Sequence, residues 1–251
     1  MIRKFFIVFV ISLMFGIPSI AKVTALTPIP SSMQEVIDIK QAVEKEDFKR
    51  ALTLLDKYLK ENPNDEQMYN NRGLVNRNLG NYNKALNDFN TAIKLDKNYY
   101  NAYYNRANLR LLQGNLKLAK KDLKKAIEIN PKYVVAYNSL GLVALQEQDY
   151  EEAVKMFSQV IRRKSKMPFA YDNRGIAYTF MEEYKKGISD FNKTIQLGYY
   201  TPQTYYLRGI CYIKTEQYNK AYNDLKTSAE LFKQAGNHKV YKKIMDLLNN
   251  K

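Results

Sequence analysis

The positions of small and bulky apolar residues repeat along this chain every 34 residues. Steps of 34 from Ala51 reach only small residues, which are Ala85, Ala119, Ala153, Gly187 and Ala221. The same steps from Leu55 reach only bulky apolar residues, which are Phe89, Leu123, Phe157, Phe191 and Leu225. Six units in one register predict an array in which each unit is a supersecondary structure that packs on the next.

Two further positions of the repeat carry a tyrosine and a small residue. The tyrosines are Tyr69, Tyr103, Tyr137, Tyr171 and Tyr205, and the small residues are Gly73, Ala107, Gly141, Gly175 and Gly209. With the period, these residue types resemble the tetratricopeptide repeat family from about residue 32 to residue 233. The resemblance implies an all-α fold, a right-handed superhelical solenoid in which each unit is an antiparallel pair of helices, A and B. The small residues would let the two helices of a pair approach closely.

The repeat register divides the array 32–235 into six units. These units are 32–65, 66–99, 100–133, 134–167, 168–201 and 202–235. The first unit lacks the tyrosine of the later units and is expected to be a degenerate N-terminal cap. Val240 and Ile244 stand at helical spacing, so residues 236–251 are expected to form a C-terminal capping helix. The segment from Ala229 to Lys242 also resembles the closing segment of exported tetratricopeptide repeat proteins of cyanobacteria.

The first 25 residues differ from the repeats in composition. Arg3 and Lys4 precede an apolar run at 5–17, which is the layout of a secretory signal. An uncleaved membrane anchor is the alternative for residues 1–25, although the run is short for a membrane span. Two prolines in 26–31 predict an extended linker. We therefore expect an exported protein, located in a periplasm, a lumen or the extracellular space, or one held at a membrane by the apolar run.

Four repeats carry an arginine and, sixteen residues later, an aspartate. The pairs are Arg72 with Asp88, Arg106 with Asp122, Arg174 with Asp190 and Arg208 with Asp224. The unit 134–167 has Leu140 and Met156 at these positions, so an apolar pair replaces both members together. We predict a salt bridge from helix A to helix B within each of the four repeats, with a structural role.

The resemblance also implies a concave groove lined by the A helices. The groove positions and the asparagines beside them are Asn70, Asn71, Leu74, Arg77, Tyr104, Asn105, Asn108, Asn138, Leu142, Asp172, Asn173, Ile176, Tyr206 and Ile210. This mixture of amides, tyrosines and branched apolar residues suits an extended segment or a helix of a protein or peptide partner. The alternative is that several of the apolar residues only pack between repeats.

Positive charge is concentrated on the predicted B helices. The chain has 40 basic and 25 acidic residues, a net charge of +15, and the lysines include Lys117, Lys121 and Lys124. Together with the run Arg162 to Lys166 they are expected to face outward on the convex side. A solvated surface is the simple interpretation, and an anionic membrane surface or an acidic partner is the functional one. Nucleic acid is not an expected partner of an exported protein.

Catalytic side chains are scarce. The chain has one histidine, His238, and one cysteine, Cys211, and neither stands in a nucleophile–base or metal-ligand pattern. The sequence therefore predicts a non-enzymatic interaction scaffold or assembly factor with no cofactor and no metal. The alternative function is a membrane-tethered organiser, or an electrostatic binder of anionic partners through the convex face.

Overall fold

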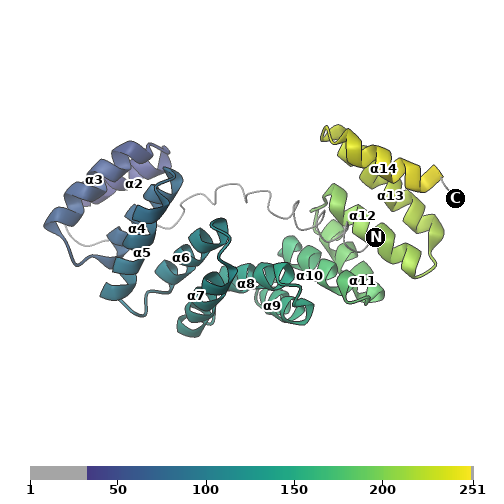
Figure 1. Ribbon diagram of the computed structural model, residues 1–251, viewed down its shortest axis with the longest axis horizontal. Helices are drawn as coiled ribbons and strands as arrows, with labels where there is room; N and C mark the ends of the chain where they lie inside the picture. The colour runs from purple at the N-terminus through teal and green to yellow at the C-terminus, as the bar shows by residue number, and fades with distance from the viewer. Residues whose placement is uncertain (1–32, 250–251) are drawn as a thin grey trace. The chain divides into compact units, whose positions relative to one another are not determined.

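The computed structural model describes residues 33–249, so the predicted signal or anchor at 1–25 and the linker at 26–31 lie outside the described residues. Within 33–249 there are thirteen α-helices and no strand (Figure 1). The helices are α2 (Met33–Glu44), α3 (Phe48–Glu61), α4 (Glu66–Asn78), α5 (Tyr82–Leu95), α6 (Tyr100–Leu112), α7 (Leu116–Ile129), α8 (Val134–Gln146), α9 (Tyr150–Arg163), α10 (Pro168–Phe180), α11 (Tyr184–Gln196), α12 (Pro202–Lys214), α13 (Tyr218–Gln234) and α14 (His238–Asn249). None of these helices combines the length and the apolar character needed to cross a bilayer.

Polar side chains mark where several helices begin. The carboxylate of Asp65 accepts a hydrogen bond from the backbone N–H of Met68 at the start of α4. Thr201 and Thr204 form a capping box at the start of α12. Helices α10 and α12 each carry a proline in the first turn, where a backbone N–H would have no hydrogen-bond acceptor within the helix. The helix boundaries thus follow from local sequence.

Consecutive helices pack as pairs. The pairs α4 with α5, α6 with α7, α10 with α11 and α12 with α13 make the most extensive contacts, and neighbouring pairs pack through α5 with α6 and α11 with α12. The short turns within the pairs make their helices antiparallel (Figure 1). This architecture confirms the prediction of an all-α solenoid of stacked helix pairs.

The turn inside each pair has a residue in the left-handed region at the same repeat position. These residues are Glu46, Gly80, Gly114, Gln148, Glu182 and Glu216, with φ between 56° and 77°. At the end of α4, the N–H of Asn81 donates to the carbonyl of Asn76 at 2.8 Å. This hydrogen bond, which spans five residues, is characteristic of a Schellman turn. This geometry closes the A helix and reverses the chain into the B helix.

The described residues form two compact units, which we call the N-terminal unit (33–136) and the C-terminal unit (137–249). In the N-terminal unit, Ile39, Leu55 and Met68 are fully buried in one apolar cluster. This cluster joins α2 and α3 to α4, so the first helix pair covers the apolar surface of the next repeat.

The last helix of the C-terminal unit packs on the helix before it. Ile244 and Leu248 of α14 are buried against Leu225 and Phe232 of α13. The apolar side of α14 thus covers this part of α13, while its other side carries lysines.

Close packing within a pair depends on glycines that face phenylalanine rings. A Cβ atom built on these glycines would lie 2.6 Å from the ring of Phe89 at Gly73, 2.7 Å from Phe157 at Gly141, and 2.9 Å from Phe191 at Gly175. Real Cβ atoms do not approach a carbon atom so closely, so the rings occupy the space that a larger residue would need. The repeat that carries Ala107 instead of glycine has Leu123 instead of phenylalanine.

Candidate binding site on the A helices

The predicted binding residues lie on the first helix of each pair, which is α4, α6, α8, α10 or α12. On α4, Asn70, Leu74 and Arg77 are four and three residues apart and therefore lie on one side of the helix. We call this side, with the equivalent positions of the later repeats, the A-helix face. The structure buries Asn70, Asn71, Asp172 and Ile176, and leaves partly exposed Leu74, Arg77, Tyr104, Asn105, Asn108, Asn138, Leu142, Asn173, Tyr206 and Ile210.

Each of the four arginines forms an ion pair with the aspartate of its own repeat. A distance of 2.7 Å joins Arg72 to Asp88, Arg106 to Asp122, Arg174 to Asp190 and Arg208 to Asp224. In the last three pairs, Nε and Nη2 donate to different carboxylate oxygens, so the contact is bidentate. The aspartate side chains are 9% exposed or less. The pairs therefore connect helices A and B in a largely desolvated setting.

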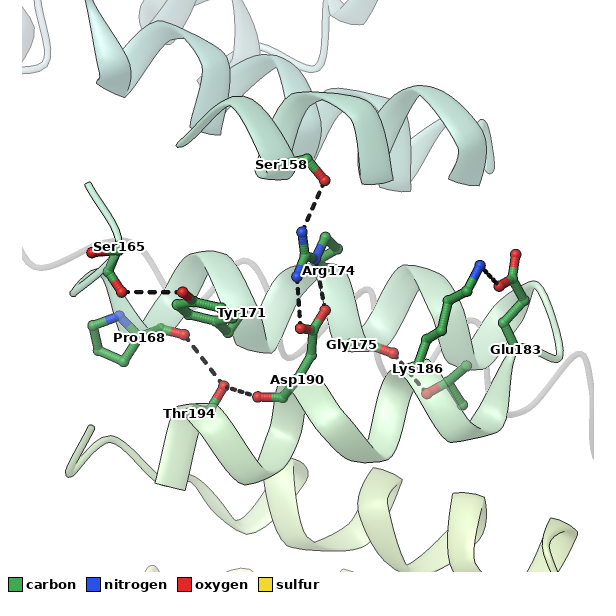
Figure 2. A network of polar contacts seen from close by, with 11 residues as sticks. Ser158, Ser165, Pro168, Tyr171, Arg174, Gly175, Glu183, Lys186, Asp190 and Thr194 are labelled. Atoms are coloured by element: carbon green, nitrogen blue, oxygen red, sulfur yellow. Dashed lines mark hydrogen bonds and ion pairs between the residues drawn. The ribbon is translucent and has the colours of Figure 1, made fainter. Parts of the chain in front are cut away.

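The same arginines also reach the preceding repeat, which sequence analysis did not predict. In each case Nη1 donates to the residue sixteen positions earlier, at 2.6 to 3.0 Å, and the acceptors are Asp56, Asn90, Ser158 and Asn192. Figure 2 shows Arg174 between Ser158 of α9 and Asp190 of α11. The interpretation of the arginines as contacts within one repeat was therefore incomplete, because Nη1 is left over when Nε and Nη2 hold the carboxylate.

Further donors complete this network in the N-terminal unit. Asn76 Nδ2 donates to Asp88 Oδ2 at 2.9 Å, and at the equivalent position Arg110 Nη1 donates to Asp122 Oδ2 at 2.6 Å. These groups stand one helical turn after the paired arginine. The network uses its charges to hold three helices together, which leaves it little capacity to bind a ligand.

Three of the predicted binding asparagines make contacts inside the protein. Asn105 Nδ2 on α6 donates to Asn70 Oδ1 on α4 at 2.8 Å. Asn71 Nδ2 lies 3.7 Å from the sulfur of Met68 on its own helix. For Asn70 and Asn71, these contacts favour a role in packing.

Two buried side-chain atoms have no hydrogen-bonding partner within residues 33–249, and both are on A helices. They are Asn78 Nδ2 on α4 and Asn138 Oδ1 on α8. Asn138 was among the predicted residues and Asn78 was not. Asn78 follows Asn70 by eight residues, about two helical turns, so the spacing that selected Leu74 and Arg77 could also have found it. Because buried polar atoms are usually hydrogen-bonded, these two atoms are candidates for contacts with a ligand.

Arg77 is the arginine of the A-helix face that has no acidic partner. The part of the chain that the structure describes offers its guanidinium neither a hydrogen bond nor an ion pair. Partial burial lowers the pKa of Arg77, while the nearby Tyr104 and Tyr82 raise it. An arginine remains charged under all ordinary conditions. The α4 helix of the N-terminal unit thus carries an unpaired cation, Arg77, and at the next residue in sequence the unpartnered amide of Asn78.

Asp172 is the charged residue of the A-helix face in the C-terminal unit. Its side chain is buried, and the hydroxyl of Thr204 on α12 donates to Asp172 Oδ1 at 2.8 Å. Burial raises the pKa of Asp172 to about 6, and the hydrogen bond from Thr204 opposes this change. Thr204 was not predicted as a site residue, because its sequence signal is that of a helix cap.

The lysines of α7 lie on the outer side of a B helix. Lys117, Lys121 and Lys124 are exposed. Arg163, at the end of α9, departs from the expectation of an outward basic run. Its guanidinium lies 4.4 Å from the ring centre of Tyr137 and bonds to the tyrosine hydroxyl, because the flat cation packs well on an aromatic face.

The remaining reactive side chains stand apart from these surfaces. Cys211 is buried, with its sulfur 3.2 Å from Thr179 Oγ1, and burial raises its pKa to about 11. His238 is exposed at the first residue of α14. Among residues 33–249, no group of three or more His, Cys, Asp or Glu side chains is placed to hold a metal ion.

Stacked antiparallel helix pairs with a 34-residue register define a helical repeat scaffold. Models of the tetratricopeptide repeat match residues 67–99, 100–133, 123–155 and 202–234. The chain belongs to the tetratricopeptide repeat proteins, whose typical role is that of a non-enzymatic scaffold binding protein or peptide partners. It is accordingly a protein-interaction scaffold.

Solved structures with the same fold include MamA, YrrB and PilF. MamA is 25% identical with a TM-score of 0.60, and the match covers 64% of this chain and 94% of MamA. YrrB, a tetratricopeptide repeat protein with an unusual peptide-binding site, is 19% identical with a TM-score of 0.67, over 76% of this chain and 97% of YrrB. PilF of Pseudomonas aeruginosa is 16% identical with a TM-score of 0.73, over 84% of this chain and 96% of PilF. No curated protein sequence matched this one.

Proposed function

We propose that this protein is an exported scaffold that binds an extended segment or a helix of a protein partner on its A-helix face. The proposed role needs no catalytic activity, cofactor or metal. The observation that carries the proposal is the position of the two unpartnered buried atoms, Asn78 Nδ2 and Asn138 Oδ1, on A helices. A peptide backbone offers a carbonyl acceptor and an N–H donor that fit such atoms.

The side chains around these atoms support a peptide ligand. At the A-helix positions, Tyr104 is partly exposed in the N-terminal unit, and Leu142, Tyr206 and Ile210 are partly exposed in the C-terminal unit. Tyrosines and branched apolar residues provide apolar contact area for alternate side chains of an extended segment. The fold is also that of YrrB, which has a peptide-binding site.

A peptide selection with matched variants tests the proposal. A library of acetylated and amidated peptides is selected on the full chain, and the affinity of the best peptide is measured for two triple variants. The test variant combines Tyr104→Ala, Asn138→Ala and Leu142→Ala. We expect it to lose binding at least about tenfold, because each truncated contact contributes on the order of 1 kcal/mol.

The control variant changes the same residue types on exposed positions of B helices. It combines Tyr222→Ala, Leu118→Ala and Asn83→Ala, all of which are exposed in the structure. Its affinity is expected to equal that of the unchanged protein. Equal binding by both variants, or equal loss in both, would reject the A-helix face as the binding surface.

A second candidate function rests on the exposed lysines of α7. Lys117, Lys121 and Lys124 form a basic outer surface that would attract an anionic membrane or an acidic partner. Binding to vesicles that contain phosphatidylglycerol should then weaken steeply with salt and should fall when the three lysines are changed to glutamine. Binding that ignores these substitutions would remove this candidate.

Export is proposed from the apolar run at 5–17, which lies outside the described residues. If residues 1–25 are a cleaved signal, the mature protein isolated from its host should begin near residue 26. If they are an anchor, Met1 should be retained or only Met1 removed, and the protein should resist extraction from membranes with alkaline carbonate. An intact N-terminus in a protein recovered from the cytosol would contradict both versions.

A further inference from the structure

Five aspartates are buried within the described part of the chain, and one of them has no cationic partner. Four are held by the arginines of their own repeats and are Asp88, Asp122, Asp190 and Asp224. The fifth is Asp172, which is 8% exposed and receives one hydrogen bond, from the hydroxyl of Thr204. Buried carboxylates are normally paired with a cation or bound by several N–H groups. Asp172 therefore lacks the neutralising partner that the other four have.

The fold does not require a carboxylate at this position. Asn70 occupies the equivalent position on α4, where it is equally buried and is bonded by a neutral amide. Asn138 occupies it on α8. An uncharged asparagine therefore satisfies the packing of this repeat position. Because the packing does not need the charge of Asp172, the charge points to a contact with a ligand.

The neighbouring repeat provides a second acceptor. Asn138 Oδ1 is buried and unpartnered, and it stands one repeat before Asp172 on the A-helix face. Both groups accept hydrogen bonds, so together they suit a ligand group that has several N–H donors. Leu142 follows Asn138 by one turn of α8 and is partly exposed, so it provides apolar surface for an alkyl stem.

We propose that Asp172, assisted by Asn138, forms a subsite that selects a lysine or arginine side chain of the bound peptide. This inference rests on the proposed function, because it specifies the chemistry of the segment that the A-helix face binds. The ammonium or guanidinium group supplies the missing counter-ion of Asp172 and donates to Asn138 Oδ1. The alkyl stem of the same side chain lies on Leu142.

The pKa of Asp172 provides an independent readout. Burial raises this pKa to about 6 in the free protein, so the carboxyl is mostly ionised at pH 7.5 and mostly protonated at pH 5. Tyr199, whose pKa is raised by burial and by the charge of Asp172, keeps its proton over this range. A bound cation favours the ionised form and lowers the pKa of Asp172. Affinity for a basic peptide should thus fall about tenfold from pH 7.5 to pH 5, following the ionised fraction of the carboxyl.

The test uses the full chain and a synthetic peptide library with blocked termini, so that side chains provide the charges. The best peptide is remade with norleucine in place of lysine and citrulline in place of arginine. We expect the neutral peptide to bind the unchanged protein at least about tenfold more weakly, since a charge-assisted hydrogen bond is lost. The Asp172→Asn variant should bind the basic and neutral peptides equally.

Controls separate this inference from the proposed function. Asp246→Asn removes the same charge from an exposed site on α14 and should keep the preference for the basic peptide. If peptides bind without any preference for lysine or arginine, or if Asp172→Asn retains the preference, the subsite is refuted and peptide binding stands. If no peptide binds, both proposals fail. Displacement of the basic peptide by equimolar spermidine would reassign the subsite to free polyamines and overturn the peptide version.

Discussion

The free protein should become more stable at neutral pH when Asp172 is replaced by asparagine. Asp172 is 8% exposed, and burial raises its pKa from the ordinary value of 3.8 to about 6. A carboxyl whose pKa is raised by folding stabilises the folded state only while it is protonated. This contribution is complete below pH 3.8 and is lost as the pH rises through about 6.

The size of the effect follows from the same two values. A difference of one pKa unit corresponds to about 1.4 kcal/mol, so the ionised carboxylate of Asp172 destabilises the fold by about 3 kcal/mol at pH 8. The Asp172→Asn variant should avoid this cost, because asparagine is neutral and its carbonyl oxygen can still accept the hydrogen bond from Thr204. At pH 4 the variant and the unchanged protein should differ little.

Urea unfolding followed by circular dichroism at pH 4, 6 and 8 measures this difference. The quantity of interest is the change in the stabilising effect of Asp172→Asn between pH 4 and pH 8, because effects that do not depend on protonation cancel. The exposed Asp246→Asn substitution controls for the net charge. If the unfolding free energies of variant and unchanged protein run parallel from pH 4 to pH 8, the argument that Asp172 is a costly unpaired charge is wrong.

Three further predictions concern the C-terminal unit. Arg174→Ala should lower the free energy of unfolding by about 3 kcal/mol, because it leaves Asp190 buried and unpaired. The double change Arg174→Leu with Asp190→Met should melt at a higher temperature than this single variant, and equal melting temperatures would refute the pairing argument. Gly175→Ala should destabilise by on the order of 1 to 3 kcal/mol because its Cβ would lie 2.9 Å from the Phe191 ring, and adding Phe191→Leu should recover part of the loss in a thermal melt. Cys211, buried and with a pKa raised to about 11, should react with a thiol reagent only after unfolding, so rapid labelling of the native protein at pH 8 would contradict its placement.

The helix pairs could be predicted from sequence because their determinants recur in every repeat. Ala51 and Leu55 begin series in which a small and a bulky residue keep their spacing six times, and no other arrangement explains this register. The pairing of Arg174 with Asp190 could be found in the same way, since the chain replaces both residues together in the unit that has Leu140.

The second contact of each paired arginine was missed although the sequence carries a signal for it. The residue sixteen positions before the arginine is Asp56, Asn90, Ser158 or Asn192, all of which can accept a hydrogen bond. Sixteen positions before Leu140, which stands in place of the arginine, the preceding unit has Lys124, which cannot accept a hydrogen bond. The signal lies between neighbouring repeats, so a comparison of positions within one repeat does not reveal it.

The unsatisfied groups of the A-helix face could not be predicted from sequence in the same way. Whether Asn78 and Asn138 have partners depends on which neighbouring side chains come within about 3 Å, and spacing along the chain does not determine this. Burial of Asp172 with a single hydroxyl partner is likewise a property of three-dimensional packing.

A comparison of equivalent positions in the repeats distinguishes charged residues that the fold needs from charged residues that occur in one repeat only. The arginine–aspartate pairs occur in four repeats and hold helices together, so their charges are structural. Arg77 and Asp172 each occur once, at positions where the other repeats from 66 to 235 have uncharged residues. An unpaired, partly buried charge is a cost to folding, and the other repeats show that the fold is built without it. The residues that select a partner are therefore expected among these single charges, and replacing them with the uncharged residues of sister repeats should alter binding without disrupting the solenoid.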